Sequence, residues 1–277
     1  MKKRILITGA TGFVGRQVLA DLLKANVELR LVVRAGSEHR LPNTPAEVVS
    51  TSDLFKESAE WWADTCQGVD IVIHAAWYAE PGLYMQSQKN LDCLTGTLQL
   101  AAGCVQAGVQ RFVGIGSCSE YDMSIGHLSV DTPLRPATPY AGAKAAAFLA
   151  LSTLLPQQGI AFVWARLFYL YGQGEDARRL VPYLRSKLCA GEIAELSGGT
   201  QIRDYLDVAL AGEQIAKLAL SQATGAMNVC SGQAQTVREL AEKIADEYGR
   251  RDLLRFGARA DNPFDPPCVV GIRSEAC

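Results

Sequence analysis

Short apolar runs alternate with longer stretches of helical periodicity through the first 165 residues of the chain. The runs are rich in β-branched residues, as strands buried on both faces of a sheet are, and we expect strands at residues 4–8, 27–33, 47–50, 70–74, 111–115 and 160–166. Between them, apolar residues recur every three or four positions, which predicts helices at residues 13–25, 58–66, 88–107 and 139–155. This alternation predicts an α/β fold, a doubly wound parallel sheet with helices on both faces.

The pattern is less regular after residue 171. Helical periodicity returns at residues 180–190, 208–221 and 236–248, with no strand pattern of comparable length between these stretches. We therefore expect one large domain at residues 1–165 and a smaller one built mainly from residues 166–277, with some segments of the second returning to the first.

A glycine-rich segment, Gly9-Ala-Thr-Gly12-Phe-Val-Gly15, follows the first expected strand and opens the first expected helix. Glycine permits a tight turn and lets the N–H groups of the helix N-terminus approach a pyrophosphate. The position between strand and helix favours a Rossmann-type dinucleotide site, with the cofactor against Gly9, Thr11, Gly12, Phe13, Val14 and Gly15. The alternative is a left-handed turn in which the glycines serve packing alone.

Arg34 stands at the end of the second expected strand, where sites that prefer NAD commonly have an acidic residue for the ribose hydroxyls. A guanidinium matches a 2′-phosphate through charge-assisted hydrogen bonds, so the sequence favours NADP(H) over NAD(H). The alternative is a solvated loop arginine. Asp53 and Leu54, after the third strand, are candidates for the adenine contact, and a plain loop aspartate is the other interpretation of Asp53.

Tyr140 and Lys144 are four residues apart on one expected helix, so their side chains share a face. A neighbouring ammonium favours phenolate over phenol, and we therefore expect Lys144 to lower the pKa of Tyr140 and make it a general acid or base. Ser117 follows the fifth expected strand, at the carboxyl edge of the sheet where ligands of α/β proteins bind. A tyrosine–lysine pair at this spacing is also common by chance.

The overall composition excludes several other classes of protein. A formal charge of −2 and the absence of long basic runs argue against nucleic acid as a partner. The eight cysteines form no C-x-x-C pair, which favours reduced thiols in the cytoplasm. No apolar run is long enough to cross a membrane, and His39, His74 and His127 lack the spacing of a metal site, so we expect neither a membrane partner nor a metal.

Several stretches together resemble the extended short-chain dehydrogenase/reductases of the NAD-dependent epimerase/dehydratase family, which act on nucleotide-sugars. They are the glycine turn, His74-Ala75-Ala76, Phe112 to Tyr121, Tyr140 to Lys144, Arg166 to Gly172 and Gln201 to Tyr205. The second half is similar to the 4-ketoreductases typified by CDP-abequose synthase. The resemblance extends over almost the whole chain.

The resemblance implies a role for each matching residue. Ser117 would hydrogen-bond the substrate oxygen, Tyr140 would transfer the proton, and Lys144 would hold the nicotinamide ribose. Ala75 and Ala76 would line the cofactor site, and Arg203 would bind the diphosphate of a nucleotide-diphosphate sugar, unless it pairs with Asp204 or Asp207. Besides Arg203, the expected substrate contacts are Trp77, Ser117, Cys118, Ser119, Tyr140, Tyr169, Arg179 and Val181.

Cys118 and Ser119 occupy the places where the family's 4,6-dehydratases have an Asp-Glu pair, which disfavours dehydration. We therefore expect NAD(P)H-dependent reduction of a nucleotide-linked 4-keto-6-deoxy sugar at C4. The alternatives are a nucleotide-sugar epimerase with tightly bound NAD and a non-catalytic dinucleotide sensor. The family also implies a homodimer formed through residues 88–107 and 139–155.

Overall fold

The computed structural model describes residues 2–262 and 265–274. A seven-stranded sheet in the order β12-β7-β5-β4-β1-β2-β3 forms its centre, and every neighbouring pair of strands is parallel. The strands are β1 (Lys3–Thr8), β2 (Val27–Arg34), β3 (Glu47–Thr51), β4 (Ile71–His74), β5 (Arg111–Ser117), β7 (Ala161–Leu167) and β12 (Gly225–Val229).

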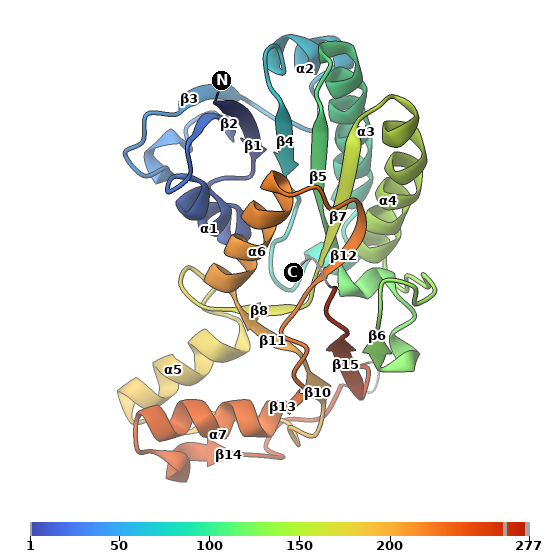
Figure 1. The fold of residues 1–277 in the computed structure, drawn as a ribbon. Helices are drawn as coiled ribbons and strands as arrows, with labels where there is room; N and C mark the ends of the chain where they lie inside the picture. The colour runs from blue at the N-terminus through green and yellow to red at the C-terminus, as the bar shows by residue number, and fades with distance from the viewer. Residues whose placement is uncertain (1, 263–264, 275–277) are drawn as a thin grey trace.

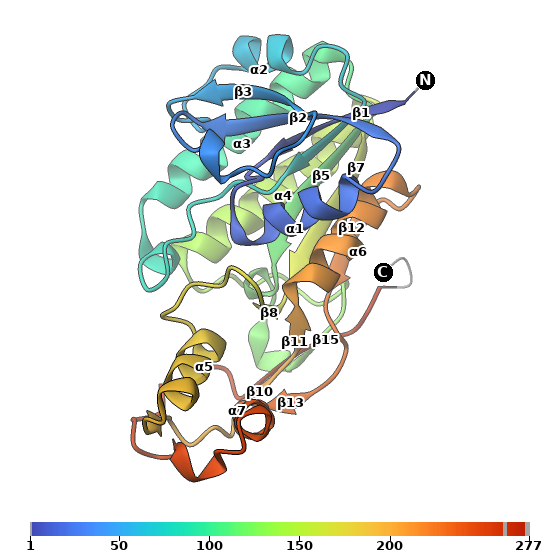
Figure 2. The ribbon, with the colours of Figure 1, turned by 90° about the vertical axis from the view of Figure 1, so that its left-hand side faces the viewer.

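Helices cover both faces of this sheet, which confirms the doubly wound α/β fold (Figures 1 and 2). One face is covered by α1 (Phe13–Leu22) and α6 (Val208–Leu220), and the other by α2 (Ala59–Thr65), α3 (Lys89–Ala107) and α4 (Pro139–Gln157). Because side chains alternate along a strand, Ile5 and Ile7 pack in the first apolar layer and Leu6 packs in the second.

A smaller unit lies beyond the carboxyl ends of the strands, in the lower half of Figure 1. Its helices α5 (Leu180–Ala190) and α7 (Val237–Glu247) pack around an apolar core of their own. Short strands connect it to the large unit: β13 (Gln235–Thr236), β10 (Ile202–Arg203), β15 (Cys268–Gly271) and β6 (His127–Leu128) form one sheet, β11 (Tyr205–Asp207) pairs with β8 (Tyr169–Tyr171), and β14 (Leu254–Arg255) pairs with β9 (Ala194–Glu195).

The six expected strands are all found, each within two residues of its predicted ends. The helix expected at residues 13–25 ends at Leu22, because the next residues form tighter turns such as Lys24 N–H to Asp21 O. The helix expected to stop at residue 155 instead continues through Pro156 to Gln157. Proline has no backbone N–H to donate, but Pro156 lies in the last turn, so the rest of the helix keeps its hydrogen bonds. Two segments from the second half of the chain, α6 and β12, lie in the large unit.

Candidate functional site

The glycine turn presents open backbone donors at the N-terminus of α1. Gly12 is the N-cap residue and no side chain caps this end, so the first N–H groups of the helix are available to a ligand. A Cβ atom at position 15 would lie 2.1 Å from the carbonyl oxygen of Gly9, so only glycine allows this close approach of strand and helix. The turn therefore fits the pyrophosphate of a dinucleotide.

Buried hydrogen bonds support this turn from below. The hydroxyls of Thr8 and Thr97 lie 2.8 and 2.9 Å from the two ring nitrogens of His74, and Ala76 N–H donates to the Thr8 hydroxyl. Burial, with a contribution from the charge of Lys144, lowers the pKa of His74 to about 3. His74 is therefore neutral and joins β1 to β4 through the Thr8 hydroxyl.

The residues expected at the adenosine end lie at the carboxyl ends of β2 and β3. Arg34 is exposed, and its side chain forms no hydrogen bond or ion pair within the described part of the chain. Arg40, a few residues later, donates to the carbonyl of Thr11 in the glycine turn at 3.2 Å. The Asp53 carboxylate accepts the N–H of Phe55 at 3.1 Å, so one of its oxygens is used in a local turn.

Ser117, Tyr140 and Lys144 come together between the end of β5 and the first turns of α4. The side chains of Tyr140 and Ser117 lie close together, and Ser117 Oγ lies 2.7 Å from Ser119 Oγ. The buried Lys144 amine donates to the carbonyl of Ile115 on β5 at 2.6 Å. Pro139 in the first turn of α4 and the Thr138 hydroxyl, which accepts the N–H of Ala141, fix the start of this helix.

The electrostatics of the pair differ from the sequence expectation. Burial raises the pKa of Tyr140 well above its usual range, and the nearby Tyr84 phenol adds to this, while the neighbouring Ser117 side chain opposes it. Burial also lowers the pKa of Lys144 to about 7, against the opposing effect of the Glu120 carboxylate. The prediction that Lys144 lowers the pKa of Tyr140 is wrong for this arrangement, because desolvation outweighs the neighbouring charge.

Aromatic rings enclose the tyrosine–lysine pair. The Lys144 amine lies 3.7 Å from the centre of the Trp77 ring, and the Tyr84 ring meets Tyr140 edge-on at 4.8 Å. Trp77 Nε1 donates to Asn90 on α3 at 2.9 Å. Trp77 thus packs against Lys144, which differs from the expected substrate contact.

A cleft of about 730 Å³ opens next to this group. Its lining includes five residues of the sequence-predicted site, namely Ser117, Cys118, Ser119, Tyr169 and Arg179. Tyr84 and Ala141 also line it, and the Tyr140 ring packs against Tyr84 without lining the cleft itself. Burial, with a contribution from the Glu120 charge, raises the pKa of Cys118 to about 12, so its thiol stays protonated at neutral pH.

Arg203 and Val181 are buried rather than open to this cleft. Arg203 pairs with Asp265 at 2.7 Å and stacks on the Tyr169 ring at 5.2 Å, so the expected alternative partners Asp204 and Asp207 are both wrong. Asp204 instead accepts backbone N–H groups, including that of Gly271, and Asp207 caps α6. Val181 belongs to the apolar core of the smaller unit.

The sequence analysis missed a buried acid beside Ser117. Glu120 is fully buried and accepts hydrogen bonds from Ser117 N–H, Trp164 Nε1 and Arg166 Nε. The available signal was the spacing of Ser117 and Glu120, since a serine followed three residues later by glutamate is typical of a capped helical turn.

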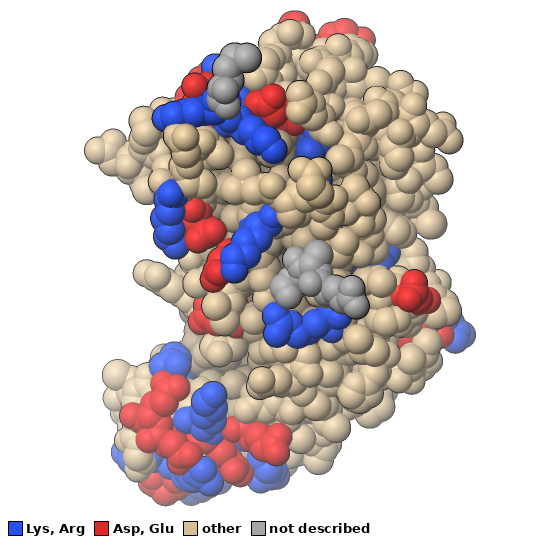
Figure 3. All heavy atoms as spheres, in the orientation of Figure 1, with Lys and Arg blue, Asp and Glu red and all other residues tan. Residues whose placement is uncertain are grey.

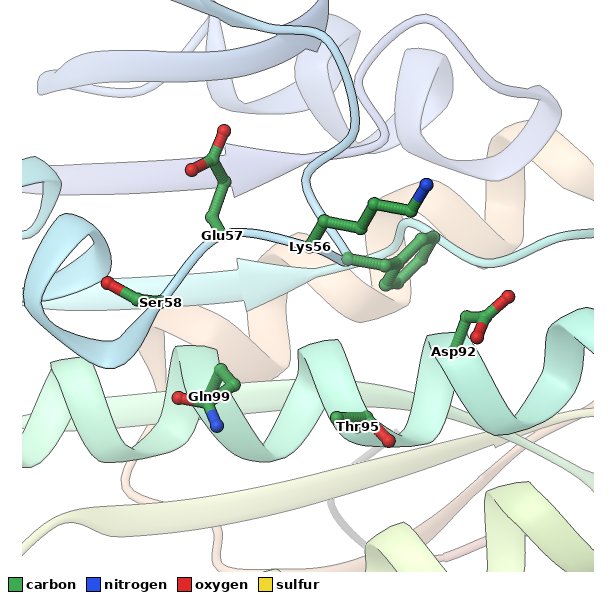
Figure 4. Close-up of a pocket in the computed structure, with 7 residues that line it drawn as sticks. Lys56, Glu57, Ser58, Asp92, Thr95 and Gln99 are labelled. Atoms are coloured by element: carbon green, nitrogen blue, oxygen red, sulfur yellow. The ribbon is translucent and has the colours of Figure 1, made fainter.

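A second hollow, of about 430 Å³, lies between the start of α2 and α3. Figure 4 shows its mostly polar lining, with Lys56, Glu57 and Ser58 before α2 and Asp92, Thr95 and Gln99 on α3. None of these residues was expected in the site. Among the described residues, no group of three or more His, Cys, Asp or Glu side chains could hold a metal ion, and no helix is long and apolar enough to cross a membrane.

A family model described as "NAD dependent epimerase/dehydratase family" matches residues 5–230. The chain belongs to this family. Its glycine turn and its tyrosine–lysine pair thus lie in an oxidoreductase of the extended short-chain dehydrogenase/reductase type, as the sequence resemblance implied.

Among its relatives is dTDP-6-deoxy-L-talose 4-dehydrogenase (NAD(+)) of Aggregatibacter actinomycetemcomitans, 23% identical over 97% of this chain and 99% of the relative. GDP-6-deoxy-D-mannose reductase of Pseudomonas aeruginosa is 30% identical over 89% and 80% of the two chains. CDP-abequose synthase of Salmonella muenchen is 24% identical over 94% and 86%. Among solved structures, MoeE5 in complex with UDP-glucuronic acid and NAD has a TM-score of 0.81 at 27% identity, over 99% of this chain and 91% of MoeE5.

Proposed function

We propose that the protein reduces the 4-keto group of a nucleotide-linked 4-keto-6-deoxy sugar. The observation that carries the proposal is the Tyr140 phenol beside the Ser117 side chain, which lines a cleft that lacks a free acid at positions 118 and 119. Because burial raises the pKa of Tyr140, this phenol holds its proton at neutral pH and can give it to a developing alkoxide. The names of the dehydrogenase and reductase relatives support the same reaction class.

Each residue of the site has a distinct part in this proposal. The bound nicotinamide supplies the hydride. Ser117 and Tyr140 hold the substrate oxygen by hydrogen bonds that strengthen as negative charge develops on it. Lys144, on the same face of α4, would bind the ribose hydroxyls with the N–H groups that do not donate to the carbonyl of Ile115.

Water elimination is disfavoured by the same geometry. The Cys118 thiol is protonated, and a serine hydroxyl is a poor acid and base. Glu120 is one residue further on, but its carboxylate is fully buried and bound to Arg166, so it does not act in the cleft. The acid and base that dehydration requires are therefore missing from positions 118 and 119.

NADPH is the proposed form of the cofactor. Arg34 is exposed at the end of β2, and Arg40 reaches the glycine turn, so two guanidinium groups are near the place where the adenosine ribose would bind. A 2′-phosphate would complete the charge-assisted bonds that these groups can donate. An NADH preference in steady-state assays of the wild-type enzyme would refute this assignment.

The proposed reaction is tested with dTDP-, CDP- and GDP-4-keto-6-deoxyhexoses and NADPH. Loss of absorbance at 340 nm with one of the three is expected, and Tyr140→Phe, which cannot donate the proton, should lower kcat by about a hundredfold or more. No oxidation of NADPH with any of them refutes the proposal. Turnover without added cofactor, with nicotinamide retained through purification, would instead indicate an epimerase.

The substrate nucleotide is proposed to bind between the cleft and the smaller unit. Arg179 lines the cleft, and Arg203 is close by, behind Tyr169. Both guanidinium groups suit a diphosphate. For Arg203 this requires an exchange of its partner Asp265 for the phosphate oxygens.

A homodimer through α3 and α4 is also proposed. Lys144 is the only charged residue of α4, and it is buried, while Leu91, Leu149 and Leu154 on the two helices are exposed. Figure 3 shows few charges in the upper right, over α3 and α4, and many around α5 and α7. Sedimentation should give a dimer that Leu149→Glu dissociates, and a monomeric wild type would contradict this.

A further inference from the structure

A desolvated ion pair lies directly behind Ser117. Glu120 Oε2 and Arg166 Nε are 2.7 Å apart, and the two side chains are 0% and 1% exposed. Trp164 Nε1 lies 3.0 and 3.1 Å from the two carboxylate oxygens, and Ser117 N–H donates to Oε1 at 2.7 Å. Three donors from two neighbouring strands thus converge on one carboxylate.

The register of β5 and β7 makes room for this pair. Gly114 is opposite Trp164 and Gly116 is opposite Arg166. A Cβ atom at position 116 would lie 2.2 Å from Trp164 Nε1 and 2.6 Å from Glu120 Oε1, so a side chain there would displace both groups. The small residues of β5 therefore admit the polar groups of β7 beneath the Ser117 turn.

The hydrogen bonds continue from Arg166 to residues further from the cleft. Arg166 Nη1 donates to the Tyr121 hydroxyl at 3.0 Å, and this hydroxyl donates to Asn228 on β12 at 2.7 Å. Asn228 in turn donates to the carbonyls of Leu128 and Ile272. Arg166 thus has a further hydrogen bond on the side away from Glu120, separate from its direct contact with the carboxylate.

Stability alone does not account for this pair. Two buried charges lose their hydration, and well-packed apolar residues of similar size often stabilise a protein as well or better. The Nη2 group of Arg166 also has no hydrogen-bond partner among the described residues. What the pair does provide is a fixed acceptor for the Ser117 N–H, at the turn where the Ser117 hydroxyl meets Tyr140.

We propose that Glu120, held by Arg166, is a positioning residue that fixes the backbone of Ser117 and so directs its hydroxyl toward Tyr140. The contacts support this directly: Ser117 Oγ accepts the N–H of Ser119 while Glu120 accepts the N–H of Ser117, and the two bonds together close the turn. The consequence for catalysis rests on the proposed ketoreductase activity.

The variant Glu120→Gln tests the inference in the full-length enzyme. Arg166 Nε and the Ser117 N–H bind different oxygens of Glu120, and the amide of glutamine has only one acceptor oxygen. The charged guanidinium takes that oxygen, so the Ser117 N–H faces the amide NH2 group and the turn loses its fixed acceptor. We expect kcat to fall by about ten- to a hundredfold with little change in the KM of either substrate, because misplacement of a reacting group by a fraction of an ångström acts on the chemical step. A kcat within about threefold of the wild type would overturn the inference.

Two further variants separate positioning from stability. Tyr121→Phe removes the hydroxyl bonded to Arg166 and Asn228 but leaves Glu120 and Ser117 in contact, so it should lower stability and leave kcat nearly unchanged. If Glu120→Gln does not fold, the double variant Glu120→Gln/Arg166→Met, which leaves no unpaired charge, replaces it and should fold but remain slow. Full activity of the double variant, or an equal loss of kcat in Tyr121→Phe, would overturn the inference.

A measurement independent of turnover completes the test. In protein labelled with ¹⁵N-serine, the Ser117 amide proton should resonate downfield in the wild type and in Tyr121→Phe, because it donates to a carboxylate, and should move upfield in Glu120→Gln. An unchanged Ser117 resonance in Glu120→Gln would overturn the inference even in an active enzyme. Failure of the wild type to reduce any nucleotide sugar would refute the proposed function alone, since the resonance still reports the position of Ser117.

Discussion

Replacing Lys144 by methionine should stabilise the cofactor-free protein while abolishing its proposed activity. The lysine amine is 3% exposed, and burial lowers its pKa from 10.5 to about 7. The unfolded chain therefore binds a proton more tightly than the folded protein does, and this difference costs about 5 kcal/mol of stability below pH 7, at about 1.4 kcal/mol for each pKa unit. Methionine has a similar length, can occupy the same space beside Trp77, and has no charge to desolvate.

The pH dependence of the stability difference shows whether the buried charge of Lys144 causes it. Since the folded-state pKa is the lower one, the cost is complete below pH 7 and is relieved as the pH rises from 7 to 10.5, so wild-type stability should increase by about 2 kcal/mol between pH 7 and pH 9 relative to Lys144→Met. His74, with a folded-state pKa of about 3 and an ordinary value of 6.5, is neutral in both states over this interval and is common to both proteins. Urea unfolding of the two proteins at both pH values measures the difference. A constant difference in stability between pH 7 and pH 9 would refute the reasoning.

Three further variants test other parts of the site. Gly15→Ala should abolish binding of the dinucleotide in a calorimetric titration, because its Cβ atom would lie 2.1 Å from Gly9 O; binding within about twofold of the wild type would contradict the fit of the turn. Arg34→Ala should raise the KM for NADPH by about tenfold or more without changing that for NADH, and an equal rise for both would contradict the 2′-phosphate contact. Asp265→Asn should lower the KM for the nucleotide sugar by releasing Arg203, and an increase would show that the 2.7 Å ion pair organises the site instead.

The sequence was sufficient wherever the determining interactions are local. The glycine turn joins two consecutive elements, the i, i+4 pair of Tyr140 and Lys144 lies within one helix, and their patterns predicted both. The partners of Arg203 and Glu120 could not be predicted in this way. Asp265 is 62 residues after Arg203 and lies in the loop before β15, while the contact of Glu120 with Arg166 depends on the register of two strands that only tertiary pairing fixes.

The direction of the pKa shift of Tyr140 could not be predicted from the sequence either. The spacing of Tyr140 and Lys144 correctly placed both on one helix, but the sign of the pKa shift depends on how much water each group keeps. Trp77, Tyr84 and the carbonyl of Ile115 come from three other segments and exclude that water. Desolvation therefore dominates, and it favours the neutral form of both side chains.

The preference of both side chains for their neutral forms favours reduction over oxidation in the proposed reaction. A protonated phenol and an amine of lowered pKa are poor at removing a proton from an alcohol but well suited to giving one to a ketone oxygen. In the proposed reaction Ser117, whose N–H donates to the buried Glu120 carboxylate, would supply a second hydrogen bond to the same oxygen. Burying Lys144 and the Glu120–Arg166 pair lowers the stability of the fold, and this is the expected cost of an arrangement that holds these groups without water next to the cleft.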